Sequence, residues 1–177
     1  RKQPGAVTYA STGSGSASHL TGELFAQQIK AEMVHVPYRG GAPAMQDLLA
    51  NRFTGYFAAP PTALPHIESG KLVPLATTGL TRPAYLPNIP TVAESGYPGF
   101  EALAWNGLVV PAGTPPATVQ KINAEVGAIL KDPEIVKKMN GFGFDLVGGT
   151  PADFGALIKG EAERWTPVVR KLGIKVD

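Results

Sequence analysis

The sequence predicts an α/β fold in which the strands of a mostly parallel sheet alternate with the helices that flank it. Short apolar runs recur along the first half of the chain, and each precedes a stretch of helical spacing about ten residues long. Strands joined through such helices run parallel, because the crossover returns the chain to the same end of the sheet. The 21 glycines and 17 prolines fall largely between these runs and so set the element boundaries.

Strands and helices are expected to alternate over the first part of the chain. The strands are predicted at residues 7–10, 33–37, 54–58 and 72–77, and the helices at 19–30, 42–51 and 60–69. Pro37 ends the second strand, because proline cannot donate to the ladder of a sheet. Pro43 falls in the first turn of the second helix, where a missing N–H costs nothing, and Gly70 closes the third helix.

The second half opens on a proline-rich, irregular stretch over residues 80–98, with a helical turn or two expected at 91–96. Three helices are then predicted to begin where a threonine or aspartate precedes a proline, at Thr114, Asp132 and Thr150. Pro167 should kink or interrupt the last of these helices, because it removes a backbone donor and crowds the preceding turn.

Strands are scarce in this second half. Only residues 102–110 and 144–147 have strand character, although a lobe built from βα units ordinarily places more strands under its helices. The missing strands either come from elsewhere or belong to an N-terminal segment that this sequence lacks, and the second explanation is favoured. The predicted domains are residues 1–79, one lobe, and 80–177, a crossover with an incomplete part of the other lobe.

Composition excludes several classes of function. The formal net charge is +2 and the lysines and arginines are scattered, so no nucleic-acid partner is predicted. No apolar run approaches the roughly 18 residues of a membrane-spanning helix, so no direct membrane insertion is expected. Cysteine is absent and the 3 histidines show no metal-ligand spacing, so neither a metal nor another cofactor is predicted.

The most distinctive motif is the loop of hydroxyl and glycine residues between the first predicted strand and the first helix. It consists of Ser11, Thr12, Gly13, Ser14, Gly15 and Ser16. The free N–H groups and the dipole of the helix start favour an anion, the glycines allow a close approach, and the hydroxyls can donate. A carboxylate or phosphate site is therefore predicted. The alternative is a plain strand-to-helix turn with a serine cap, which needs fewer small polar residues.

Two further loops are expected at the same end of the sheet, where open α/β sheets bind ligands. Tyr38, Arg39 and Gly40 follow the second strand; Arg39 could pair with a ligand carboxylate, and Tyr38 could wall a pocket. Arg39 is equally compatible with a solvated arginine on a glycine turn. Ala58 and Ala59 follow the third strand without any hydrogen-bonding side chain, so they offer shape and backbone groups, or simple packing.

No catalytic residue is predicted. His19 and Glu23 stand four residues apart on the first helix, which is usually a surface pair, and His19 is kept among the candidate ligand-binding residues. The nucleophile-elbow, phosphate-loop and dinucleotide patterns are all absent from the loop. A hydrolase that uses His19 or Glu23 remains a minor alternative.

A specific order of motifs runs through essentially the whole chain, at residues 7–16, 18–25, 34–40, 43–44, 47–49, 64–67, 70–72, 75–76, 89–96, 111–116 and 164–165. This order resembles the tripartite tricarboxylate transporter receptors, also called the Bug family of periplasmic binding proteins. The resemblance implies two lobes of the type II periplasmic-binding-protein fold, the Venus flytrap, which close on a small carboxylated solute. It also implies a periplasmic location and delivery of the solute to the subunits of a membrane permease.

The resemblance also places the ligand. In this family two loops, one from each lobe, grip a carboxylate together with ordered water, and the loop at residues 11–16 matches that of the second lobe. Residues 1–79 would then be the ligand-binding lobe. The loop of the first lobe has no counterpart here, which implies that an N-terminal part of the family fold is missing. Relatives often carry an aspartate or asparagine where this chain has Ala58 and Ala59, so a polar contact to the distal end of the ligand is expected to be lost.

The function predicted is therefore binding without reaction. Thr12→Ala or Ser16→Ala is expected to weaken binding by about 1–3 kcal/mol, because a charged acceptor would lose one partner. The alternatives are a ligand-sensing effector domain of a regulator and, less favoured, the hydrolase. The identity of the carboxylate stays open, although the apolar third loop favours a less polar distal end.

Overall fold

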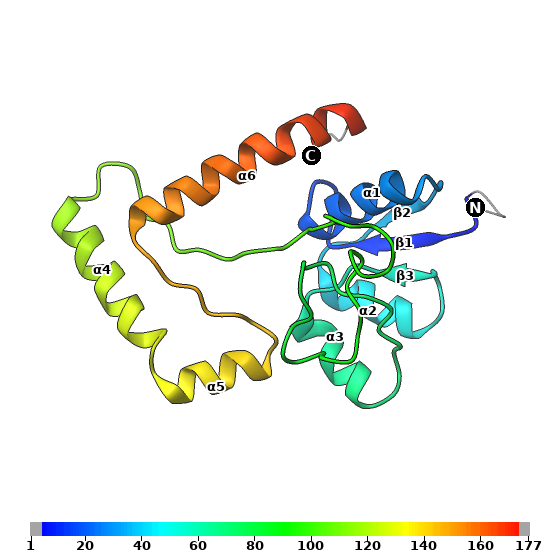
Figure 1. Cartoon of the computed structure of the whole chain (residues 1–177), viewed down its shortest axis with the longest axis horizontal. Helices are drawn as coiled ribbons and strands as arrows, with labels where there is room; N and C mark the ends of the chain where they lie inside the picture. Colours follow the sequence, from blue (N-terminus) through cyan, green and yellow to red (C-terminus); the bar gives the residue numbers. More distant parts are fainter. Residues whose placement is uncertain (1–4, 174–177) are drawn as a thin grey trace. The chain divides into compact units, whose positions relative to one another are not determined.

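The computed structural model describes residues 5–173, apart from the side chain of Leu172 (Figure 1). The chain divides into two compact units. The first comprises the residues up to Ala104 together with the end of the chain from Val168, and the second comprises Trp105–Pro167. The predicted lobe boundary at residue 79 falls inside the first unit and stays a proposal.

The first unit contains a parallel sheet of three strands in the order β2-β1-β3. These strands are β1 (Thr8–Ser11), β2 (Val34–Pro37) and β3 (Gly55–Tyr56), and β1 pairs in parallel with both neighbours. Each strand lies where an apolar run predicts it, and the parallel α/β class is confirmed. Because β1 is the central strand, its end is the point around which the loops of both neighbours gather (Figure 1).

A helix follows each strand within one or two residues of its predicted start. These helices are α1 (Ala17–Ile29), α2 (Gly41–Leu49) and α3 (Pro60–Glu68). Successive side chains of β1 point to opposite faces of the sheet, which explains how these helices pack. Tyr9 faces α1, where it meets Gly22, and Ala10 packs against Ala44 of α2. Both faces of β1 are therefore covered, and Tyr9 and Ala10 are buried.

The predicted strand at residues 72–77 is wrong. The structure has only an isolated parallel bridge there, between Thr77 and Thr91. Val73 and Leu75 are exposed, because no strand of the described residues lies beside this segment to form a ladder. The expected helical turn at 91–96 is present: the Thr91 hydroxyl accepts from the Glu94 N–H at 3.0 Å, and the Glu94 carboxylate accepts from the Thr91 N–H at 2.8 Å.

The second unit contains α4 (Pro116–Ile129), α5 (Pro133–Gly141) and, up to Pro167, α6 (Pro151–Leu172), whose last residues belong to the first unit. The aspartate cap is confirmed, since Asp132 Oδ1 accepts from the second and third N–H groups of α5 at 2.8 and 3.3 Å. Thr150 caps α6 by accepting from the Asp153 N–H at 3.2 Å. The predicted cap at Thr114 is wrong, because its hydroxyl donates to the Pro111 carbonyl and Pro115 takes the cap position.

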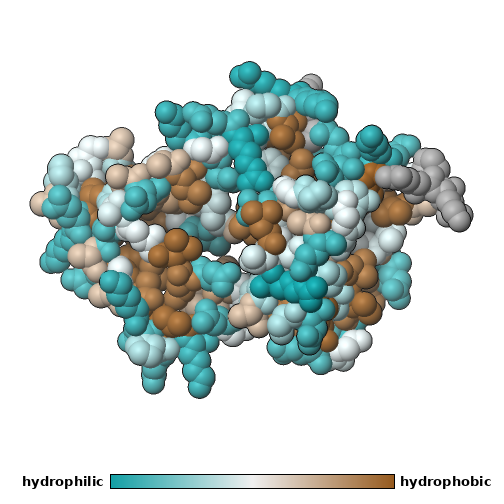
Figure 2. Space-filling view, in the orientation of Figure 1, coloured by the Kyte–Doolittle hydropathy of each residue, from teal (hydrophilic) through white to brown (hydrophobic). Residues whose placement is uncertain are grey.

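The predicted strands at 102–110 and 144–147 are also wrong. Both segments lie without a regular ladder, and Leu108, Val109 and Val147 remain exposed, Val147 to 92%. Apolar side chains also reach the surface on the face that Figure 2 shows. These segments are largely apolar and end in valine, but strand formation needs a hydrogen-bonding neighbour, and the described residues supply none here.

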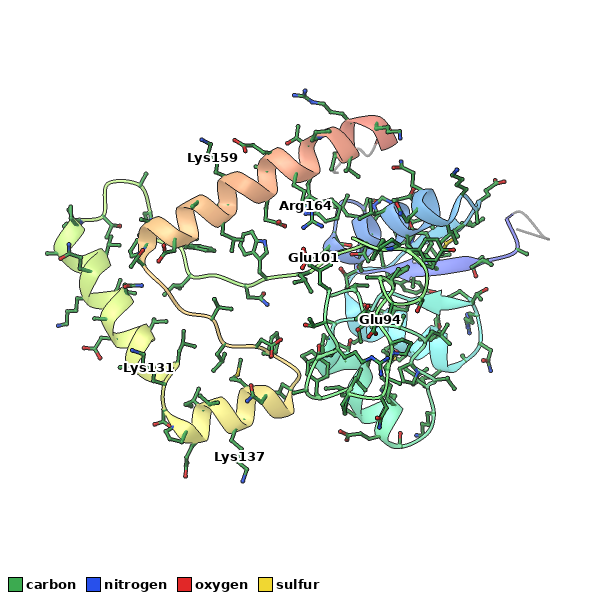
Figure 3. The ribbon with its side chains drawn as sticks, in the orientation of Figure 1. Glu94, Glu101, Lys131, Lys137, Lys159 and Arg164 are labelled. Atoms are coloured by element: carbon green, nitrogen blue, oxygen red, sulfur yellow. The ribbon has the colours of Figure 1, made fainter. Side chains whose placement is uncertain are left out.

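Of the kink or interruption predicted at Pro167, the interruption is wrong. Helix α6 continues through this residue to Leu172. Pro167 removes the donor for the carbonyl of Glu163, and that residue is exposed, so water can satisfy the carbonyl. The labelled Lys137 and Lys159 project outward from α5 and α6 (Figure 3). Among the helices that the structure describes, none has both the length and the apolar character that crossing a membrane requires.

Candidate functional site

The carboxyl ends of β1 and β2 bring the first two candidate loops together. The Tyr38 N–H donates to the Ser11 carbonyl at 3.0 Å, so the chain after β2 lies beside the chain after β1. A Cβ placed on Gly13 would lie 3.6 Å from the Tyr38 carbonyl oxygen. The backbone of Gly13 has a φ of 138°, a value that side chains rarely allow. An added Cβ would make only an ordinary contact there, so glycine is needed at this position for its backbone conformation.

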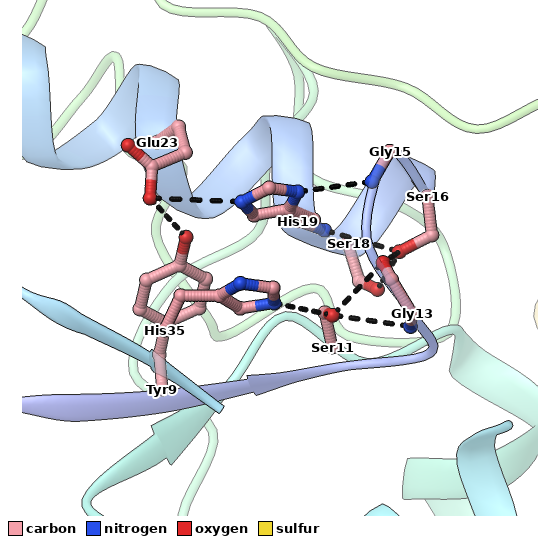
Figure 4. A network of polar contacts seen from close by, with 9 residues as sticks. All are labelled: Tyr9, Ser11, Gly13, Gly15, Ser16, Ser18, His19, Glu23 and His35. Atoms are coloured by element: carbon pink, nitrogen blue, oxygen red, sulfur yellow. Dashed lines mark hydrogen bonds and ion pairs between the residues drawn. The ribbon is translucent and has the colours of Figure 1, made fainter. Parts of the chain in front are cut away.

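The hydroxyl groups of the loop at residues 11–16 largely hold the loop itself (Figure 4). Ser11 is fully buried, and its Oγ accepts from the Gly13 N–H at 3.1 Å. The Ser16 hydroxyl donates to the Gly13 carbonyl at 2.6 Å and caps α1 by accepting from the His19 N–H. The Ser18 Oγ accepts from the Thr12 N–H at 3.0 Å. These groups therefore fix the shape of the loop.

The groups that remain available belong mainly to the backbone. No hydrogen bond joins the exposed Ser14 to another residue of the described chain. The first N–H groups of α1, those of Ala17 and Ser18, have no partner within the helix. Thr12 is exposed, and its hydroxyl has one long contact of 3.3 Å, with Ser18. Donors for an anion thus surround the start of α1.

The start of α2 adds a second set of donors. Its cap residue, Gly40, has a φ of 109° and supplies no side-chain hydrogen bond, so the N–H groups of Gly41 and Ala42 are uncapped. A Cβ on Gly41 would lie 3.3 Å from the Tyr56 hydroxyl and 3.9 Å from the Thr12 methyl group. Residues from the ends of β1, β2 and β3 therefore meet around the first residue of α2.

The two side chains of the second loop differ in what they can do. Arg39 is exposed, and no carboxylate of the described residues pairs with it. Its guanidinium is therefore available to an anion from outside. Tyr38 packs against the core cluster that contains Phe53, and its hydroxyl donates to Asp47 at 2.8 Å. Tyr38 thus supports the loop through its packing.

The third loop contributes no side-chain donor. Ala58 lies half-buried and Ala59 is exposed, and Ala59 is the cap residue of α3 without a side-chain hydrogen bond. Pro60 and Pro61 open this helix, so its first positions have no N–H to offer. The polar group near this edge is instead the hydroxyl of Tyr56, which precedes the loop on β3.

Behind the first loop lies a cluster of aromatic and titratable side chains (Figure 4). The imidazole rings of His19 and His35 stack with their centroids 3.8 Å apart and their planes 10° from parallel. The Tyr9 hydroxyl donates to Glu23 Oε1 at 2.6 Å, and His19 Nε2 lies 3.8 Å from the same oxygen. His19 therefore packs inward, instead of forming the surface pair with Glu23 that helices usually show.

Burial sets the protonation of this cluster. It lowers the pKa of His19, and the nearby Glu23 carboxylate opposes part of that shift. The pKa of His35 is lowered by burial and, to a smaller extent, by the neighbouring His19. Burial also raises the pKa of Tyr9, and its hydrogen bond to Glu23 acts in the same direction. These shifts favour the neutral form of both imidazoles and the protonated form of the phenol.

The contact between Ser11 and His35 does not make a nucleophile. Ser11 Oγ lies 2.6 Å from His35 Nε2, a distance that suits proton transfer. The serine is fully buried, however, and its oxygen is also bound to the backbone of Gly13, so no substrate carbonyl can reach it. The described residues contain no group of His, Cys, Asp and Glu that could hold a metal ion.

Two residues near the site, His35 and Tyr56, were not among the site residues predicted from the sequence. His35 stands in register with Tyr9 across β1 and β2, so its side chain shares the face that α1 covers. That placement could have been inferred from strand alternation once the parallel pairing was assumed. Tyr56 ends β3, and only the folded structure shows its hydroxyl beside the start of α2.

Comparisons with known proteins identify the family of the chain. The model of the tripartite tricarboxylate transporter family receptor matches residues 1–174. The "UPF0065 protein in tcbD-tcbE intergenic region" of Pseudomonas sp. (strain P51) is 37% identical over 170 residues, which are 96% of this chain and 51% of that protein. Protein BugT of Bordetella pertussis is 35% identical over 176 residues, 99% of this chain and 54% of BugT. The chain thus spans about half the length of these curated relatives.

Solved structures share the fold. The structure described as R. palustris Rpa4515 with adipate has a TM-score of 0.92 at 34% identity, and the match covers 98% of this chain and 58% of that one. MatC (Rpa3494) from Rhodopseudomonas palustris with bound malate has a TM-score of 0.82 at 29% identity, covering 93% and 57%. Because the family model matches this chain along almost the chain's whole length, the chain belongs to the tripartite tricarboxylate transporter receptor family.

Proposed function

We propose that this chain forms the ligand-binding part of an extracytoplasmic solute receptor that binds a small carboxylate and delivers it to a membrane permease. The observation that carries the proposal is that the start of α1, the uncapped start of α2 and the exposed Arg39 follow neighbouring strands at one end of a parallel sheet. Backbone N–H groups and an arginine suit a carboxylate, since both form charge-assisted hydrogen bonds with its oxygens.

The proposed contacts follow from which groups are free. The N–H groups of Ser14, Gly41 and Ala42 would donate to the carboxylate, and Arg39 would pair with it. The buried serines would act indirectly, by fixing the loop. The side-chain hydroxyls of Thr12 and Ser14 are exposed, and that of Thr12 is only weakly engaged, so the loss of Thr12 should weaken binding more directly than the loss of Ser16.

The ligand class is supported by the relatives. One similar structure is described with adipate and another with bound malate; both ligands are dicarboxylates. The alanines of the third loop and the phenol of Tyr56 would give the distal end of the ligand a mostly apolar surface with a single hydroxyl. Among dicarboxylates, one with an aliphatic spacer fits this surface. The location would be periplasmic and the protein would release its ligand unchanged.

The test is thermal unfolding with adipate, malate and adipamide, the neutral diamide of the same length as adipate. The chain is measured and, where its gene encodes a longer receptor, that receptor too. A ligand at about 100 times its Kd stabilises the folded state by about 2.7 kcal/mol. This corresponds to a rise in Tm of on the order of 5–10 °C. A rise with a dicarboxylate but not with adipamide supports the proposal, and equal or absent shifts contradict it.

A further inference from the structure

The helix that follows the loop is capped in an unusual way. In a common capping box, a glutamate or glutamine at the third position of a helix accepts a hydrogen bond from the backbone near the cap residue. Here the cap residue is Ser16, and the third helical position holds His19. The imidazole Nδ1 of His19 accepts from the Gly15 N–H at 3.0 Å, while Ser16 accepts from the His19 N–H. A titratable ring thus takes the place of an amide or carboxylate.

A second histidine holds the other glycine of the loop. His35 Nε2 lies 2.6 Å from Ser11 Oγ, and that oxygen accepts from the Gly13 N–H. The two glycines that shape the loop are therefore tied to two imidazoles, Gly15 directly and Gly13 through Ser11 (Figure 4). Because the loop is otherwise made of small residues, these ties fix where its free N–H groups point.

The geometry allows the hydrogen bond between Gly15 and His19 only when the His19 ring is neutral. His35, in contrast, can donate from Nε2 to Ser11 Oγ in either state, because the Ser11 hydroxyl has the Gly13 carbonyl as its own acceptor. A protonated imidazole carries hydrogen on both nitrogens, so His19 Nδ1 could no longer accept from Gly15. The rings lie 3.8 Å apart, face to face, and His19 is 7% exposed, so water cannot separate two cations in this position. Glu23 from α1 and Tyr9 from β1 are the other titratable groups that face the pair, and they bring at most one negative charge.

We propose that His19 and His35 are positioning residues for ligand binding, which hold the loop at residues 11–16 in its anion-accepting shape, and that the loop is released at Gly15 when His19 takes up a proton. This inference rests on the proposed function for its consequence, carboxylate affinity, but the effect on the loop itself needs no ligand. Burial, which favours the neutral rings, is consistent with it.

The test follows the loop directly by nuclear magnetic resonance on the chain between about pH 7.5 and about pH 4.5. Imidazole ¹⁵N shifts report the tautomer of His19 and its protonation, and hydrogen exchange reports the protection of the Gly15 amide. We expect an unprotonated Nδ1 at neutral pH and a loss of Gly15 protection of about tenfold as His19 is protonated, because one hydrogen bond loses its acceptor.

Variants separate positioning from general acid unfolding. His19→Gln keeps an acceptor but cannot be protonated, so Gly15 protection should be the same at both ends of the pH range. His19→Leu should lack the protection throughout. His66→Gln, on α3 and outside the network, is the matched control and should keep the wild-type pH profile. If wild type shows no pH dependence at Gly15, or if His19→Gln shows the same dependence as wild type, the proposal is overturned.

The consequence for binding is measured with adipate by calorimetry. The carboxyl groups of adipate titrate in this range too, so the readout is the ratio of wild-type affinity to that of His19→Gln, in which the titration of the ligand cancels. We expect this ratio to fall about fivefold on acidification. A constant ratio overturns the link to binding. If Gly15 responds to pH but adipate and malate bind at no pH, the positioning role stands and the proposed function fails.

Discussion

Gly22→Ala is the substitution for which the structure gives the clearest expectation. Gly22 lies in the middle of α1, directly over the buried ring of Tyr9. A Cβ at this position would lie 2.1 Å from Tyr9 Cε2 and 2.6 Å from two further atoms of the same ring. No side chain sits at such distances, so either the ring or the helix must move. The ring cannot turn freely, because its hydroxyl is bound to Glu23.

Two opposing terms set the size of the effect. Alanine is favoured over glycine in a helix interior by about 1 kcal/mol. Overpacking a filled core costs about 1–3 kcal/mol, and a contact this short belongs at the upper end. We expect a net loss of about 1–2 kcal/mol in the free energy of unfolding, or a fall in Tm of about 2–8 °C for a chain of this size.

Urea unfolding followed by circular dichroism measures this loss. The matched control is Gly127→Ala on α4, where an added Cβ would meet nothing within 4 Å. That variant should be stabilised by up to about 1 kcal/mol, since only the helix preference acts. Tyr9→Leu in the Gly22→Ala background should recover part of the loss by making room. Stabilisation of Gly22→Ala equal to that of Gly127→Ala would refute the packing of α1 on β1.

The remaining predictions concern the cap of α5, the histidine pair and the free arginine. Asp132→Ala should destabilise the chain by about 1 kcal/mol in urea unfolding, because two N–H groups lose their acceptor; an unchanged midpoint would contradict the cap. The folded-state pKa values of His19 and His35 are lowered from the ordinary 6.5, so the unfolded chain binds protons first. Their contribution to stability is therefore complete above about pH 6.5 and is lost as the pH falls through and below it, whereas stability that rises on acidification would contradict the buried neutral pair. Arg39→Gln should weaken dicarboxylate binding by about 1–3 kcal/mol in calorimetry while leaving Tm without ligand unchanged, since its side chain is exposed and unpaired within the described chain.

The sequence was sufficient for elements that carry their stabilising partners nearby. Each strand of the sheet in the first unit is followed by its own helix, so local pattern and final structure agree. The strand predictions at residues 72–77, 102–110 and 144–147 were wrong. Composition favours a strand there, but a strand forms only where an adjacent strand is present to pair with it. The predicted interruption at Pro167 was wrong for a related reason. The energetic cost of a proline inside a helix depends on whether the carbonyl that loses its donor is exposed to water, and periodicity does not reveal this.

The structure brings the first two candidate loops together, and it shows which of their side chains hold the loop and which are exposed. The glycines and hydroxyls at residues 11–16 do lie at the start of α1, beside Tyr38 and the start of α2. A sequence cannot tell whether a serine hydroxyl faces a ligand or its own loop, and here Ser11 and Ser16 face the loop. The stacking of His19 on His35 joins residues 16 positions apart and depends on the register of β1 and β2.

Amide chemical-shift mapping with adipate tests the central claim most directly, because it shows where a carboxylate binds as well as whether it binds. The account predicts that the largest shifts fall on Ser14, Gly41 and Ala42, at the starts of α1 and α2, with smaller ones near Tyr56. Adipamide at the same concentration should leave these amides unmoved. Shifts confined to residues 105–167, or equal shifts with the neutral diamide, would contradict a carboxylate site at this end of the sheet.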